Sequence, residues 1–174
     1  MPGTVESARL SAASHAAASG VAIIGAEALM GLGENAVVVD VRTLAERLVA
    51  RIPRSYSAAD FEAADPEICR NKTVVVVCTV GRRSGAYAAR LLDRGGVWNA
   101  VLNSEGIVSY SHAEAAYGSG PFALVDAAGQ PANALHCYAA PWDHGSPRFK
   151  AVRFGPAGAV LAAAWPALLD RCYR

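Results

Sequence analysis

The sequence predicts an α/β fold in which helices cover both faces of a parallel β-sheet. Three short apolar runs, at residues 36–41, 73–77 and 97–102, have the length and composition of strands that are buried on both faces. Segments with helical spacing separate these runs. Buried strands that alternate with helices require crossover connections, which join parallel strands within one sheet.

The first run, AVVVDV, leads into a predicted helix over Thr43–Ala50. Thr43 and Glu46 have the spacing of a capping box at the start of that helix, and Pro53 ends it. The polar stretch Ser55–Asn71 follows, and its composition predicts short helices and turns.

The second run, TVVVV, is followed by a loop and by a predicted helix between Ser84 and Leu92. The apolar residues of this segment fall on one helical face: Tyr87, Ala88, Leu91 and Leu92. The pair Gly95 and Gly96 closes the helix, and the third run comes directly after it.

The length of 174 residues suits one domain with an appendage, because single domains commonly contain roughly 100–150 residues. We expect an N-terminal helix or tail over residues 1–19, the α/β domain over residues 20–118 and a C-terminal extension, residues 119–174, packed on that domain. Hydrophobic residues make up 53% of the chain and charged residues 18%, which is typical of a globular protein. The net charge of +1, without a run of Lys or Arg, argues against nucleic acids and anionic membranes as partners.

The four cysteines, Cys69, Cys78, Cys137 and Cys172, do not form CxxC pairs. Their spacing indicates neither a zinc site nor a disulfide framework, so we expect no metal and a reducing, intracellular compartment. The first 30 residues lack the features of a secretory signal, which leaves the cytoplasm or an organelle such as a plastid or mitochondrion. Residues 157–169 are apolar but shorter than the roughly 20 residues of a membrane-spanning helix, so we expect a docked helix and no stable membrane span.

The C-terminal extension alternates short apolar runs with glycine and proline. Phe122–Val125 and a strand near Ala134–Tyr138 are predicted to pair as a hairpin across a turn at Ala128 and Gly129. We expect the extension to brace an edge of the sheet. A flap over the loop that follows the second strand is the alternative.

Cys78 is the first residue beyond the second predicted strand, at the edge of the sheet where α/β proteins bind their ligands. A free thiol has a pKa of roughly 8.5 and its thiolate is the nucleophile, so a reactive cysteine needs surroundings that favour the anion. The loop CTVGRRS offers backbone N–H groups, the N-terminus of the following helix and the guanidinium groups of Arg82 and Arg83. Gly81 allows a tight turn, and Ser84 is predicted to be the N-cap of the helix.

The length of this loop distinguishes two chemistries. Cysteine phosphatases need five residues between the cysteine and the arginine that grips the phosphate. Here Arg83 follows Cys78 after only four residues, and Ser84 occupies the position of the phosphatase arginine. The smaller loop suits a cysteine persulfide, whose terminal sulfur carries the negative charge, better than a tetrahedral phosphate.

At these residues the sequence resembles the rhodanese (sulfurtransferase) family. Residues 36–42, AVVVDVR, are similar to the strand of that family that ends in Asp-x-Arg, and residues 78–83 are similar to its six-residue active-site loop. The stretch VWNAVLNSEGIVSY is similar to its closing element, and the extension resembles that of some plant, algal and cyanobacterial single-domain members. Arg51, Arg54 and Tyr110 differ from the family's usual His, Gly and Trp, which concerns local packing and substrate preference.

The resemblance implies a rhodanese-like fold and a two-step transfer without a metal or organic cofactor. The Cys78 thiolate would take a sulfane sulfur from a small anionic donor such as thiosulfate, and the persulfide would pass it to cyanide or to a thiol, including a protein thiol. The residues implied to bind the donor or the persulfide are Thr79, Val80, Gly81, Arg82, Arg83 and Arg42. Asp40 and Ser84 would support this site.

Structural alternatives exist for these residues and for the chain as a whole. Cys78 could be an inert buried cysteine, and Arg42 could form a salt bridge with Glu46. His136 and His144 are expected to be structural, because attack of a thiolate on a sulfane sulfur removes no proton. The alternative functions are a non-catalytic rhodanese-like module that binds a partner or senses redox state and, less favoured, a cysteine phosphatase or arsenate reductase.

Overall fold

The structure, a computed structural model, describes residues 4, 6, 10, 19–117, 120–137 and 144–154. Within these residues, a five-stranded parallel sheet has the strand order β1-β5-β4-β2-β3. Its strands are β1 (Ile23–Ile24), β2 (Ala36–Asp40), β3 (Tyr56–Ser57), β4 (Thr73–Val77) and β5 (Ala100–Ser104). Because β4 is the middle strand, the residue after it lies at the centre of the sheet's carboxyl edge.

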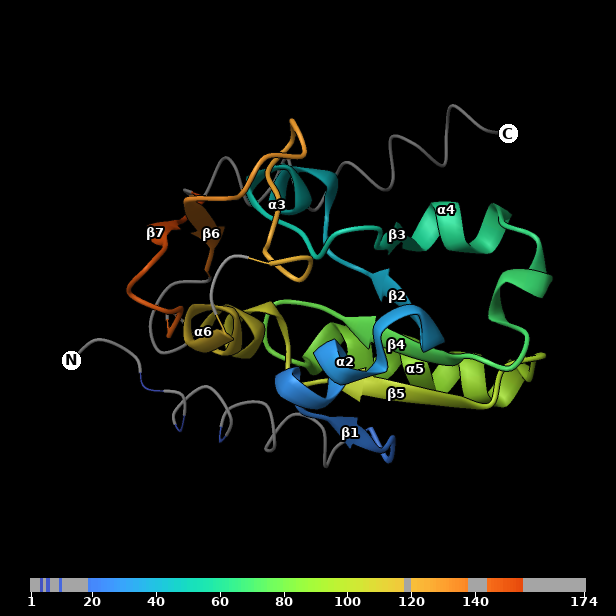
Figure 1. Cartoon of the computed structure of the whole chain (residues 1–174). Coiled ribbons are helices and arrows are strands. Elements are labelled where there is room, and N and C mark those ends of the chain that lie inside the picture. Colours follow the sequence, from blue (N-terminus) through green and yellow to red (C-terminus); the bar gives the residue numbers. More distant parts are fainter. Residues whose placement is uncertain are drawn as a thin grey trace.

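Helices cover both faces of this sheet (Figure 1). Residues of α2 (Ala26–Leu32) and α6 (Ile107–Tyr117) pack in the core on one face, and residues of α4 (Ala58–Ala63) and α5 (Arg82–Arg94) pack in the core on the other. The remaining elements of the domain are α3 (Leu44–Val49) and the 3₁₀ turns η1 (Gly33–Asn35) and η2 (Pro66–Cys69). The α/β fold expected from the sequence is therefore confirmed.

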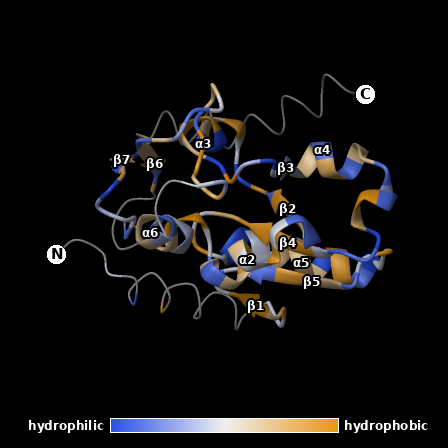
Figure 2. Ribbon diagram, viewed as in Figure 1, coloured by the Kyte–Doolittle hydropathy of each residue, from blue (hydrophilic) through white to orange (hydrophobic). Residues whose placement is uncertain are grey.

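The valines of β4 explain why its sequence is an unbroken apolar run. Val75 and Val77 face the core beneath α2 and α6, whereas Val74 and Val76 face the core beneath α4 and α5. All four have an exposed fraction of 0%, and complete burial of one such side chain contributes roughly 1.5–3 kcal/mol. Figure 2 accordingly shows the central strands as hydrophobic segments between helices of mixed character.

The predicted capping box at the start of α3 is confirmed. The Thr43 hydroxyl accepts a hydrogen bond from the Glu46 amide at 3.3 Å, and the Glu46 carboxylate accepts one from the Thr43 amide at 2.9 Å. The helix ends at Val49, before Pro53. The short helix α4 and the turn η2 occupy the following polar stretch, as its composition predicts.

The strand expected at residues 97–102 lies further along the chain, at Ala100–Ser104. Its position follows from β4, because the two strands pair from Thr73 and Ala100 onwards and the Asn99 amide already donates to the Lys72 carbonyl just before the ladder. Val97 is exposed and precedes the sheet. The apolar pattern located the strand but not its first residue.

The C-terminal extension contains a second, two-stranded parallel sheet, formed by β6 (Ala134–His136) and β7 (Lys150–Val152). The predicted turn near Ala128 and Gly129 is present, but Val125 pairs across it with Pro131. The hairpin partner expected near Ala134–Tyr138 is therefore wrong. The Asp126 carboxylate accepts the amides of Ala128 and Gln130, and this closes the turn too early for the later residues to pair.

The described residues of the extension lie against α6 and against the residues that follow α3 (Figure 1). The backbone of Val125 exchanges two hydrogen bonds of 2.9 Å with that of Arg51. From α6, the Ser111 hydroxyl accepts the Ser146 amide at 3.0 Å, and the Glu114 carboxylate accepts the Leu124 amide at 3.0 Å. The extension thus contacts two regions of the expected domain that are far apart in the sequence, the backbone that follows α3 and the side chains of α6.

Several expectations concern residues that the structure does not describe. These are most of the N-terminal helix or tail at residues 1–19, the docked helix at residues 157–169, Tyr138 and Cys172. Among the residues that are described, none of the helices has the length and apolar character needed to cross a membrane.

Candidate active site

The loop Cys78–Arg83 connects the central strand β4 to α5. Cys78 directly follows β4, as expected, and is 1% exposed. The hydroxyl of Ser84 donates a hydrogen bond to the Cys78 sulfur at 3.3 Å. A donor at this distance stabilises negative charge on the sulfur, and the first amides of α5 have no acceptor within their own helix.

Gly81 determines where α5 begins. It is the N-cap and has a φ of 84°, which glycine adopts readily because it lacks a Cβ. The helix therefore starts at Arg82, and Ser84 lies within its first turn instead of capping it. This corrects the role expected for Ser84, whose side chain contacts Cys78 instead of a backbone amide of the helix end.

Carbonyl groups of the loop are hydrogen-bonded by neighbouring elements. The side chain of Asn103 on β5 donates to the Gly81 carbonyl at 2.9 Å, and the Ile107 amide at the start of α6 donates to the Cys78 carbonyl at 2.9 Å. Carbonyl oxygens repel an anion. Because these two carbonyls point towards donors on β5 and α6, the inside of the loop is left to its amide groups.

Gly106 allows α6 to approach the loop closely. Its φ is 102°, and a Cβ at this position would lie 2.4 Å from the Thr79 carbonyl oxygen. The Ser104 hydroxyl accepts the Gly106 amide at 3.0 Å and fixes this turn. Glycine is therefore required here both for its backbone conformation and for its lack of a side chain.

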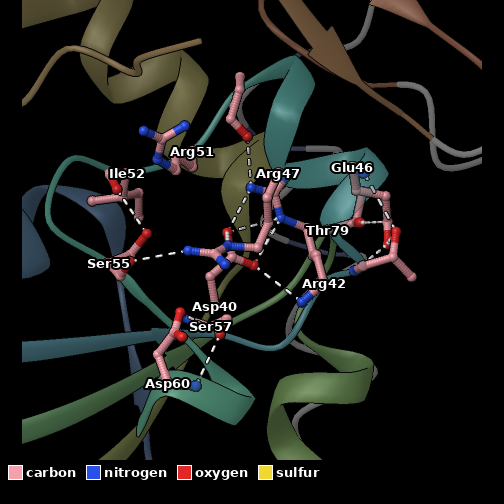
Figure 3. Close-up of polar contacts among 12 residues, drawn as sticks. Asp40, Arg42, Glu46, Arg47, Arg51, Ile52, Ser55, Ser57, Asp60 and Thr79 are labelled. Carbon is pink, nitrogen blue, oxygen red and sulfur yellow. Dashed lines mark hydrogen bonds and ion pairs between the residues drawn. The ribbon is translucent and has the colours of Figure 1, made fainter. Parts of the chain in front are cut away.

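The carboxylate of Glu46 links α3 to the loop. Arg83 donates to both of its oxygens, at 2.7 and 2.8 Å, and the Thr79 hydroxyl lies 3.3 Å from Oε1 (Thr79 and Glu46 are labelled in Figure 3). The amide and hydroxyl of Thr43 donate to Oε2, both at 2.9 Å. The Nδ1 atom of His136, from the extension, lies 3.3 Å from Oε1.

This arrangement keeps Glu46 ionised. Burial alone would raise the pKa of Glu46, whose side chain is 3% exposed, but the contacts with Arg83 and His136 outweigh burial and hold the pKa far below its usual range. The carboxylate is thus ionised at neutral pH and places a negative charge beneath the loop.

The two arginines of the loop differ in their surroundings. Arg83 is half-buried, and its terminal nitrogens are occupied by Glu46 and by the Thr79 hydroxyl, which Nη2 reaches at 3.0 Å. Arg82 is exposed and makes no ion pair within the part of the chain that the structure describes. Of the two loop arginines, Arg82 is therefore the one whose guanidinium faces solvent without an ion-pair partner among the described residues.

Arg42 does not occupy the position expected for a donor-binding residue. It is 4% exposed and forms a two-nitrogen contact with Asp40, whose shortest distance is 2.7 Å. It also donates to the Ala50 carbonyl at 2.7 Å, and Arg47 approaches the same Asp40 at 3.7 Å (Figure 3). The structure therefore corrects both expectations for Arg42, because it neither faces the loop as a substrate ligand nor pairs with Glu46. Asp40 also accepts the Arg42 amide at 3.1 Å and so holds this cluster together.

The structure brings together Cys78 and its loop, Thr79, Val80, Gly81, Arg82, Arg83 and Ser84, and leaves the Asp40–Arg42 pair beneath α3. Sequence reasoning missed Asn103, Gly106 and His136 as contacts of the loop region. It considered Glu46 as a helix cap and as a partner of Arg42, but not as a partner of Arg83. A lone amide in an apolar strand was the available signal for Asn103. No local signal indicated that His136 would reach Glu46. No metal-binding group of His, Cys, Asp and Glu side chains occurs among the described residues.

The sequence matches the family described as Rhodanese-like domain over residues 26–113, slightly more than half of the chain. The chain belongs to the rhodanese-like family. The matched region of this rhodanese-like chain begins at α2, includes the loop Cys78–Arg83 and ends within α6.

Solved structures that are similar to this rhodanese-like chain include the following three. A protein of unknown function from Rhodopseudomonas palustris CGA009, described as a possible tyrosine phosphatase, is 22% identical, with a TM-score of 0.46, and the match covers 65% of this chain and 96% of that one. A rhodanese-related protein from Thermoplasma volcanium is 24% identical, with a TM-score of 0.44, and the match covers 60% and 97% of the two chains. A thiosulfate sulfurtransferase from Pseudomonas aeruginosa is 23% identical, with a TM-score of 0.49, and the match covers 74% of this chain and 24% of that one. No curated protein matched the sequence significantly.

Proposed function

We propose that this chain is a sulfurtransferase that carries a sulfane sulfur on Cys78. The observation that carries the proposal is the position of the Cys78 sulfur, which follows the central strand, precedes the N-terminus of α5 and receives a hydrogen bond from Ser84. Membership of the rhodanese-like family supports the same chemistry.

In the first step, the Cys78 thiolate attacks the outer sulfur of thiosulfate. A sulfur–sulfur bond forms at Cys78, the sulfur–sulfur bond of thiosulfate breaks, and sulfite leaves with the electron pair. The product is a cysteine persulfide whose terminal sulfur is negatively charged. No proton is transferred in this step, so it needs no general base.

In the second step, a nucleophile attacks the terminal sulfur of the persulfide. Cyanide gives thiocyanate, and a thiolate gives a new persulfide; in either case the sulfur–sulfur bond at Cys78 breaks and the Cys78 thiolate is regenerated. The cycle therefore consumes one donor and one acceptor without an external oxidant or reductant.

The loop residues have distinct roles in this proposal. The exposed Arg82 attracts the anionic donor, and the amides of Thr79, Val80 and Gly81 hold the persulfide. Arg83 is a positioning residue, because Glu46 and Thr79 already occupy its terminal nitrogens.

The geometry disfavours a phosphatase. A phosphatase arginine must offer two nitrogens to the phosphate, and those of Arg83 are bound to Glu46. A non-catalytic module that binds a partner or senses redox state is the second candidate. The near-complete burial of Cys78 favours it, since a donor molecule must reach a sulfur that is 1% exposed.

Intact-mass measurement after incubation of the reduced protein with thiosulfate tests the proposal. We expect a gain of one sulfur atom that cyanide removes as thiocyanate, and no gain for Cys78→Ser. Cys69→Ser is the matched control, because Cys69 is buried at the opposite end of β4 and burial raises the pKa of its thiol. A folded wild-type protein that gains no mass would contradict the proposal in favour of the non-catalytic module.

A further inference from the structure

His136 belongs to the extension, yet it contacts the residue that organises the loop. It is the last residue of β6, is 4% exposed, and has its Nδ1 atom 3.3 Å from the Glu46 carboxylate. Its ring stacks on that of Phe154, with the ring centres 4.3 Å apart and the planes 27° from parallel. The imidazole is thus held between an aromatic ring and a buried carboxylate.

We propose that His136 is a positioning residue of the active site, which holds the Glu46 carboxylate in the orientation that fixes Arg83 and Thr79 in the loop. This inference rests on the proposed sulfurtransferase function and deepens it. It also gives the C-terminal extension a part in catalysis beyond covering the domain.

The contacts of Glu46 explain how the effect reaches the loop. Its Oε2 atom receives Arg83 and the amide and hydroxyl of Thr43, whereas Oε1 faces Arg83, Thr79 and His136. Loss of the imidazole nitrogen leaves Oε1 with Arg83 and Thr79 alone, in a site where the Glu46 side chain is only 3% exposed to water. The carboxylate can then turn towards the amide and hydroxyl of Thr43, which hold Oε2. Such a turn moves Oε1 away from Arg83, so Arg83 cannot keep its hydrogen bonds to both oxygens.

His136 differs from the other attachments of the extension in the residue that it contacts. The bonds to Arg51, Ser111 and Glu114 hold the extension to the domain through groups that do not contact the loop in this structure. A brace would need only these bonds. The contact with Glu46 adds a link from β6 to the residue that binds Arg83.

The first test replaces His136 with phenylalanine, which keeps a ring against Phe154 but has no nitrogen to offer Glu46. We expect kcat/KM for sulfur uptake from thiosulfate to fall on the order of 10-fold, the scale of a small misplacement in an active site. His136→Asn, which can place an N–H near the position of Nδ1, should restore most of the rate. Arg148→Ala is the control. Arg148 contacts Glu114 at 3.4 Å, so its replacement loosens the extension at a different point.

Equal kcat/KM values for His136→Phe and the wild type would overturn the proposal, as would an equal loss in Arg148→Ala. If His136→Phe does not fold, His136→Asn and His136→Leu replace it, since the two side chains have similar shapes and only asparagine can donate. Equal rates for this pair would likewise overturn the proposal.

Amide hydrogen exchange tests the inference independently of sulfur transfer. We expect the peptide that contains Cys78–Arg83 to exchange faster in His136→Phe than in the wild type, with no such change in Arg148→Ala. If the wild type takes up no sulfur, the proposed function fails, and the exchange of this peptide still decides whether His136 positions the loop. Unchanged exchange in His136→Phe would refute it.

Discussion

Replacement of Glu46 by glutamine tests the electrostatic basis of the loop. The substitution keeps the shape of the side chain but removes the charge that Arg83, Thr43 and His136 face. One amide oxygen remains, and the new NH₂ group turns towards donors. We therefore expect a substantial loss of stability from a change of almost no volume.

The magnitude follows from the burial of the two partners. Breaking a fully buried ion pair costs about 3–5 kcal/mol, but the Arg83 side chain is 32% exposed, so water can solvate part of the charge left behind. Hydrogen bonds to charged groups contribute about 1.5–3 kcal/mol each. We expect Glu46→Gln to lower the free energy of unfolding by about 2–3 kcal/mol, which for a chain of this size lowers Tm by about 4–12 °C.

Urea unfolding followed by circular dichroism at several pH values provides the assay. The folded pKa of Glu46 lies below its unfolded value of 4.5, so its contribution is complete above that pH and is lost as the pH falls towards the folded pKa. The difference in the free energy of unfolding between the wild type and Glu46→Gln should therefore shrink as the pH falls below about 4.5. Glu62→Gln, which alters an exposed pair with Arg94, should cost less than about 1 kcal/mol. The reasoning would be refuted if Glu46→Gln lowered the free energy of unfolding by the same amount at pH 7 and in acid. A loss of stability no larger than that of Glu62→Gln would refute it as well.

Two further substitutions probe the contacts of the loop. Gly106→Ala should lower the free energy of unfolding in urea by about 1–3 kcal/mol and slow sulfur uptake, because it strains a backbone with a φ of 102° and places a methyl group against the Thr79 carbonyl. The control is Gly31→Ala, on α2 with open space around it, which should not destabilise the protein. Equal losses of stability in the two variants would contradict this explanation. Ser84→Ala should keep α5 intact but lower the rate of sulfur uptake by about 5- to 10-fold, the equivalent of one hydrogen bond of about 1–1.5 kcal/mol. An unchanged rate in Ser84→Ala would show that the hydroxyl does not assist the sulfur.

The sequence predicted those parts of the fold that depend on local patterns. The valines of β4 are buried against an apolar core on both faces of the sheet. An unbroken apolar run is what such a position requires, so the run alone identifies a central strand. The pair Thr43 and Glu46 is separated by three residues, and its capping box follows from that spacing. The position of Cys78 after β4 is predictable for the same reason, because it depends on where a single strand ends.

Contacts between distant elements were not predictable in this way. Arg42 has carboxylates both two residues before it and four residues after it, and only the end of β2 shows that Asp40 is its partner. Ala134–His136 carries the pattern of a strand, but its parallel partner, Lys150–Val152, comes after a long connection. A turn signal indicates a hairpin partner close in sequence and says nothing about a parallel one.

The contact between Glu46 and His136 has a consequence for the order in which the protein becomes complete. Synthesis proceeds from the N-terminus, and N-terminal parts of a chain generally fold first. The sheet, Cys78 and Glu46 therefore emerge from the ribosome while β6 has still to be translated. A product truncated before Ala134 would carry Cys78 and the arginines of its loop, but it would lack the imidazole beside Glu46 as well as Leu135 and Cys137, which belong to the buried core. The residues that complete the surroundings of the loop therefore also complete the core of the domain.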